Sequence, residues 1–129
     1  SPIRVVIEDP VTNKELKNSR FAKYQALVKG LHYRIQIASI KQMYKGKIIN
    51  RNDAFVDKEK HTGLYRYYVG LFDNFADAAK LLTEVQELGV KDAFIVPFAN
   101  GGRMEKVAVQ DLKNTFPDLL QYIKFYKIK

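Results

Sequence analysis

The stretch YRIQIASI at residues 33–40 alternates isoleucine with polar or small residues, a pattern typical of a half-buried β-strand. Its tyrosine–arginine start recurs in YRYYVGLF at residues 65–72. We predict that both stretches are strands of one sheet. In the first strand, Ile35 and Ile37 fall on the same side because side chains alternate. That side should face the core.

The other side of these two strands carries polar and aromatic side chains. Arg34 and Gln36 alternate with the isoleucines, and Arg66 and Tyr68 share one side of the second strand. Cationic donors, an amide and an aromatic ring suit a sugar polymer with carboxylates, or a single-stranded nucleic acid. An ordinary solvated sheet face is the alternative interpretation.

The order of the elements predicts the fold class. The predicted elements are a strand at 33–40, a helical turn at 42–45, strands at 54–57 and 64–69, a helix at 75–88 and a strand at 94–98. This βαββαβ order is the split βαβ pattern of ferredoxin-like and RNP-like folds. We therefore predict an α+β fold with a four-stranded antiparallel sheet, helices on one face and the other face free. Pro97 places the last strand at an edge.

The helix at 75–88 has the clearest local signals. An apolar stripe at helical spacing contains Phe75, Ala78, Ala79, Leu82 and Val85. Asn74 is suited to cap the first turn, and Gly89 is suited to the left-handed position that ends a helix. This helix should cover the core side of the sheet.

Both ends of the chain lie outside this pattern. We predict an N-terminal extension at 1–30, the domain proper at 31–102 and a C-terminal helical extension at 103–129. The first extension should hold a short strand at 3–7 and a helix capped by Ser19. The last should hold one or two short helices, broken at Pro117.

Composition limits the classes of function. The 129 residues suit one globular domain, and the net charge of +8 favours a polyanionic partner such as nucleic acid, an acidic glycan or anionic lipid. No cysteine is present, so disulfides and thiolate sites are excluded. No apolar run approaches the roughly 20 residues that span a bilayer. No signal-peptide pattern precedes the first strand, which leaves the compartment open.

Catalytic patterns are missing from the sequence. The two histidines, His32 and His61, have no cluster of metal ligands around them, and we expect both at the surface or a boundary. No serine lies in a nucleophile elbow, and the acidic pairs fall on the cap and the polar face of the helix at 75–88. We predict that the protein is not an enzyme and needs no metal or cofactor.

Four motifs, in order, resemble the SPOR (sporulation-related repeat) family. Residues 33–40 are similar to its opening strand, an aromatic residue followed by Val/Ile-Gln-Val/Ile-Gly/Ala-Ser/Ala-Phe. Residues 64–72 resemble its third strand, 75–79 the start of its helix and 91–96 its last strand. Together the motifs extend over about residues 31–102.

The resemblance implies a noncatalytic module that binds peptidoglycan in the bacterial periplasm or cell envelope. The implied ligand is glycan strands that lack stem peptides, which occur where amidases work at the division site. Removing the peptide frees the lactyl carboxylate of the muramic sugar, so the strand becomes a polyanion. Arginine and glutamine donors suit such a ligand.

The family's glycan contacts map onto four residues of this chain: Gln36, Ser39, Arg66 and Ile95. We add Arg34 and Tyr68 from the outward face, and Leu64, which stands where the family often has tryptophan. Strict alternation puts Ser39 on the opposite side of the strand from Gln36. The resemblance therefore implies a bulge or break between these two residues.

Two alternatives remain open. An RNA- or single-stranded-DNA-binding module would have the same topology and charge, but the aromatic-rich RNA-recognition signature is missing from the sequence. A protein-interaction module of an envelope complex would use the extensions at 1–30 and 103–129. This second alternative is compatible with peptidoglycan binding, and other envelope proteins are then expected partners.

Overall fold

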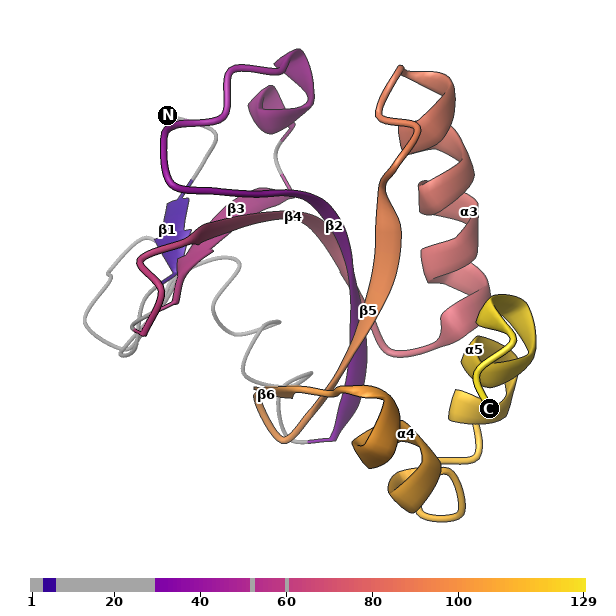
Figure 1. Ribbon diagram of the computed structural model, residues 1–129. Coiled ribbons are helices and arrows are strands. Elements are labelled where there is room, and N and C mark those ends of the chain that lie inside the picture. The colour runs from indigo at the N-terminus through magenta and orange to yellow at the C-terminus, as the bar shows by residue number, and fades with distance from the viewer. Residues whose placement is uncertain (1–3, 7–29, 52, 60) are drawn as a thin grey trace, which may run out of the picture.

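The chain forms a curled sheet with its longest helix on the convex side (Figure 1). This computed structural model describes residues 4–6, 30–51, 53–59 and 61–129. The predicted helix capped by Ser19 lies outside the described residues. Both the α+β class and the antiparallel pairing of the central strands are confirmed.

The sheet has six strands in the order β1-β3-β4-β2-β5-β6. The strands are β1 (Arg4–Val6), β2 (Leu31–Ile40), β3 (Ala54–Lys58), β4 (Tyr65–Phe72), β5 (Phe94–Ala99) and β6 (Gly102–Arg103). The helices are the 3₁₀ turn η2 (Lys47–Asn50), α3 (Phe75–Glu87), α4 (Lys106–Leu112) and α5 (Leu119–Tyr126). The prediction of four strands is therefore wrong, because one short strand adds to each edge of the predicted sheet.

The two additional strands differ in direction. β1 pairs parallel with β3, so part of the predicted N-terminal extension joins the sheet. β6 pairs antiparallel with β5 over Phe98 and Ala99 only. The Pro97 carbonyl accepts a hydrogen bond from the Met104 amide. In an antiparallel strand, the backbone nitrogen and carbonyl of one residue point toward the same neighbouring strand. Proline lacks an N–H donor, and at Pro97 this missing donor would point toward the outer edge. No hydrogen bond to β2 is therefore lost.

The first predicted helical turn is misplaced. Residues 42–45 are irregular, and the turn lies after Gly46, in η2. Only Ile48 of this turn is buried. The split βαβ pattern thus keeps its strands and second helix, while its first helix is reduced to a single turn.

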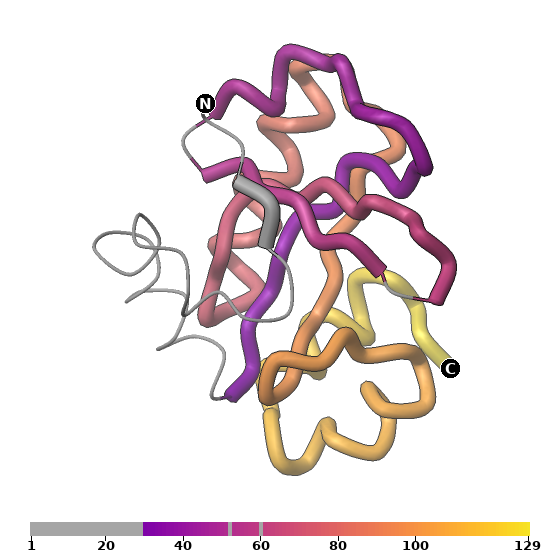
Figure 2. The backbone as a smooth tube through the Cα atoms, turned by 90° about the vertical axis from the view of Figure 1, so that its left-hand side faces the viewer, coloured from indigo at the N-terminus to yellow at the C-terminus, as the bar shows by residue number. Residues whose placement is uncertain are grey.

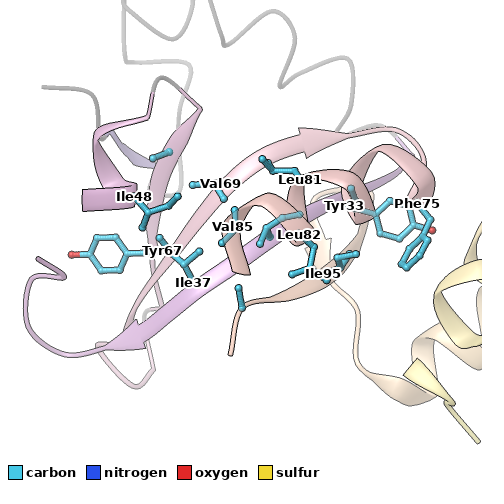
Figure 3. Close-up of a cluster of buried hydrophobic side chains, with 14 of the residues drawn as sticks. Tyr33, Ile37, Ile48, Tyr67, Val69, Phe75, Leu81, Leu82, Val85 and Ile95 are labelled. Carbon is cyan, nitrogen blue, oxygen red and sulfur yellow. The ribbon is translucent and has the colours of Figure 1, made fainter. Parts of the chain in front are cut away.

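α3 forms the main core with the convex side of the sheet (Figure 3). The buried residues of the helix are Phe75, Ala78, Leu81, Leu82 and Val85. Asn74 accepts a hydrogen bond from the Asp77 amide at 2.9 Å, and Gly89 has φ 112° just past the helix end. Both predicted helix signals are confirmed. The core side predicted for Ile35 and Ile37 is confirmed too.

The C-terminal segment packs on the same domain. α4 and α5 lie on either side of the predicted break at Pro117, and Figure 2 shows them gathered at the β6 end of the sheet. A carboxylate oxygen of Asp118 accepts a hydrogen bond from the Phe75 amide, at 2.8 Å. The Tyr126 hydroxyl accepts one from the Ile95 amide, also at 2.8 Å. The segment therefore helps to cap α3 and to close the open edge of β5.

Buried tyrosines predict alkaline destabilisation. Burial raises the pKa of four tyrosine hydroxyls, those of Tyr33, Tyr68, Tyr122 and Tyr126. In the unfolded chain such groups ionise near pH 10, so above about pH 10 the unfolded state loses protons that the folded state keeps. The free energy of unfolding should then fall as the pH rises, with a lower denaturant midpoint at about pH 11 than at about pH 9. Tyr122→Phe should weaken this dependence. A constant wild-type midpoint would contradict the prediction.

Candidate functional site

The sheet face opposite α3 is concave and forms the candidate site (Figure 1). We call it the concave face. Its described side chains come from five strands and include His32, Arg34, Gln36, Ser39, Phe55, Asp57, Arg66, Tyr68, Phe94, Val96, Phe98 and Arg103. The mixture of arginines, carboxylate, amide and rings matches the predicted chemistry of the outward side.

An apolar cluster with an arginine at its centre occupies the middle of the concave face. The Arg34 guanidinium carbon lies 3.7 Å from the ring centroid of Phe98, and 5.1 Å from the centroids of both Phe55 and Tyr68. All three rings are buried. Such contacts stabilise a cation that has left water.

Arg34 also has polar partners inside this cluster. Its Nη1 donates to Asp57 Oδ2 at 2.6 Å, and its Nε donates to His32 Nε2 at 3.1 Å. Burial raises the pKa of the Asp57 carboxyl, and the charge of Arg34 opposes that shift. His32 stacks on the Phe98 ring with centroids 5.0 Å apart.

These contacts correct two predictions. Arg34 was expected to face solvent on a free sheet face, but only 1% of its side chain is exposed. His32 was expected at the surface or a boundary, and it is fully buried. The physical reason is the curl of the sheet, which brings rings from β3, β4 and β5 around one point. The concave face therefore has a small core of its own.

A bulge in β2 brings the polar residues together. Gln36 pairs with Tyr68, whereas Ala38 pairs with the next residue, Tyr67, so β2 holds one extra residue here. After the bulge, Ser39 lies directly opposite Arg66. The bulge that the resemblance implied is thus present, and it turns Ser39 to the side of Gln36.

A shallow pocket of about 210 Å³ opens beside these residues. Its lining consists of Asp57, Lys58, Glu59, Arg66, Tyr68, Phe98, Gly101 and Arg103. Arg66 Nη2 lies 2.7 Å from Glu59 Oε2, and each side chain is 27% exposed. The pocket combines cations with a phenol ring and remains open to solvent.

Arg103 is a site residue that the sequence reasoning missed. Its Nη1 donates to Gln36 Oε1 at 2.6 Å and to the Tyr68 hydroxyl at 3.0 Å. The signal was available in Asn100-Gly101, because such a pair favours a two-residue hairpin turn with positive φ at both positions. The two φ values are 50° and 84°, and β6 returns along β5. The predicted domain boundary at residue 102 instead placed Arg103 in the C-terminal extension.

The SPOR domain family model matches residues 29–97. The chain belongs to the SPOR domain family. SPOR domains are peptidoglycan-binding modules that occur in bacterial cell-envelope and division proteins. Searches of the curated proteins and of the solved structures gave no match.

This SPOR domain places the predicted site residues in three environments. Five lie on the concave face: Arg34, Gln36, Ser39, Arg66 and Tyr68. Leu64 is half-buried and lies directly before β4. Ile95 lies on the convex side, fully buried in the main core, so its side chain is not part of the concave face.

The described part of the SPOR domain has no recognisable metal site and no membrane-spanning helix. No group of three or more His, Asp or Glu side chains there is arranged to hold a metal ion. Among the described helices, none has both the length and the apolar character to cross a membrane.

Proposed function

We propose that this SPOR domain binds peptidoglycan without catalysing a reaction, through its concave face. The proposed ligand is the glycan strand from which stem peptides have been removed, and the proposed place is the periplasmic division site. The observation that carries the proposal is the bulge in β2. It gathers Gln36, Ser39 and Arg66, all within the family-matched residues, on one polar surface.

The chemistry of the denuded strand fits this surface. Each muramic sugar that has lost its peptide exposes a lactyl carboxylate, and guanidinium groups bind carboxylates with strong, directional hydrogen bonds. Amide and hydroxyl groups such as those of Gln36 and Ser39 suit sugar hydroxyls. The net charge of +8 should speed association with a negatively charged polymer.

Co-sedimentation with sacculi tests the proposal directly. The domain should pellet weakly with intact sacculi and more strongly after amidase digestion has exposed the carboxylates. Failure to pellet with both preparations would refute the proposal. Salt-sensitive binding to single-stranded oligonucleotides, tighter than to digested sacculi, would instead favour the nucleic-acid alternative.

Gln36→Ala and Arg66→Ala should each weaken pelleting with digested sacculi. The expected loss is roughly three- to tenfold, because each variant removes one or two hydrogen bonds to the ligand. Both variants should fold, since Arg66 is partly exposed and Gln36, although only 7% exposed, is not a member of either apolar core cluster. Circular dichroism checks the fold in parallel.

Lys80→Ala is the matched control for these two variants, because Lys80 is exposed on α3, on the other side of the sheet. It should pellet as the wild type does. A loss equal to that of Arg66→Ala would show that overall charge, and not the concave face, determines binding.

A further inference from the structure

We propose that Arg103, which lies beyond the family-matched residues, binds the carboxylate of the glycan and orients Gln36 for the sugar. This inference rests on the proposed function. Arg103, a residue of β6, is then a further specificity determinant of the concave face. The contribution comes from the part of the chain that the sequence assigned to an extension.

The position of Arg103 is set by the hairpin between β5 and β6. Arg103 is the register partner of Phe98, so both side chains point to the concave face. From there the guanidinium reaches across β5 to Gln36 on β2 and Tyr68 on β4. Arg103 also lines the pocket that holds Arg66.

The charge of Arg103 is not balanced within the described residues. Of the three described arginines on the concave face, Arg34 pairs with Asp57 and Arg66 pairs with Glu59. The two acceptors of Arg103 are an amide oxygen and a phenol oxygen, both neutral, because burial raises the pKa of the Tyr68 hydroxyl. A bound carboxylate would supply the missing negative charge.

The hydrogen bonds of Arg103 leave donors for a ligand. Only Nη1 is used within the described chain, whereas Nη2 and Nε complete the planar fork that binds a carboxylate through two bonds. With its Oε1 held by Arg103, the Gln36 amide directs its nitrogen elsewhere, and this nitrogen has no hydrogen bond to a described residue. Gln36 is then set to donate to a sugar oxygen.

The test compares two forms of one ligand. Amidase-digested sacculi carry free lactyl carboxylates, and treatment with methylamine and a carbodiimide converts these carboxylates to neutral amides. We expect the wild type to bind the neutral form about tenfold or more weakly. Arg103→Gln should bind the charged form about tenfold more weakly and should lose most of the preference for it. Lys80→Gln, with the same change in charge, should behave as the wild type.

The outcomes separate the inference from the proposed function. If the wild type binds neither form, the proposed function fails. If the wild type binds and Arg103→Gln keeps its affinity, or weakens both forms while keeping the preference, the inference is overturned. Arg103→Lys guards against misfolding of the glutamine variant: it keeps the charge but cannot hold Gln36 and a carboxylate through one fork. It should bind the charged form several-fold more weakly, and wild-type affinity of this variant would also overturn the inference.

Discussion

Replacing Leu119 with alanine should lower the free energy of unfolding by about 3 kcal/mol, within the usual range for a leucine truncated in a packed core. Leu119 begins α5 and is fully buried in the main core, although it lies in the predicted C-terminal extension. The neighbouring Asp118 binds the first turn of α3. Shortening the Leu119 side chain should therefore destabilise the whole domain. Urea unfolding followed by circular dichroism measures the loss.

Leu120→Ala is the matched control, because the adjacent leucine is 54% exposed. It should change the free energy of unfolding by less than about 0.5 kcal/mol. If both variants unfold at the wild-type midpoint, the segment at 103–129 is an extension that the domain does not need. The predicted boundary at residue 102 would then stand.

Arg34→Met should also cost about 3 kcal/mol of stability. Removing one partner of a buried ion pair leaves the other charge without compensation, at a cost of about 3–5 kcal/mol. The lower value is appropriate because the Asp57 side chain is still 29% exposed to solvent. The variant also loses the cation contacts to the rings around Arg34. Chemical denaturation gives the difference directly.

Arg51→Met is the control for this prediction. Arg51 pairs with Asp53 at 2.9 Å, but its side chain is 35% exposed, and pairs near the surface contribute about 1 kcal/mol or less. Arg34→Met combined with Asp57→Leu should recover part of the stability, since neither charge then remains. Equal effects of Arg34→Met and Arg51→Met would show that Arg34 is an ordinary surface residue.

The stability of Arg34→Met would also distinguish an arginine that stabilises the fold from arginines that bind the ligand. Arg34 was predicted as a donor to the glycan, yet its guanidinium lies among rings and carboxylate inside the protein. Arg66 and Arg103 line the open pocket. We therefore expect variants of Arg34 to change stability first, and variants of the other two to change binding.

Much of the local structure was predictable from residue pattern. The strands at 33–40 and 65–72 and the helix after Asn74 were found at nearly their observed bounds. The side that faces the main core was correct as well, because alternation and helical spacing depend only on neighbouring residues. The bulge between Gln36 and Ser39 followed from the family resemblance rather than from alternation.

The concave face was predictable only in part. Gln36, Arg66 and Tyr68 lie on it as predicted, but Gln36 and Tyr68 are buried there (7% and 2% exposed) and do not face solvent. Ile95 was carried over from the family contacts and lies in the opposite layer. Arg103 was missed because the predicted domain ended at residue 102, whereas β6 returns along β5 and brings Arg103 to the concave face. Both differences concern which residues from distant segments lie on the concave face.

Residue pattern alone sufficed for the four central strands, for α3, for their core-facing sides and for the family, since each depends on spacing along a short stretch of chain. Only the tertiary structure decided that Arg34 is buried, that Ile95 belongs to the main core and that Arg103 reaches Gln36. These features depend on the curl of the sheet and on strand register. Both arise from packing between residues far apart in sequence, for which local periodicity carries no signal.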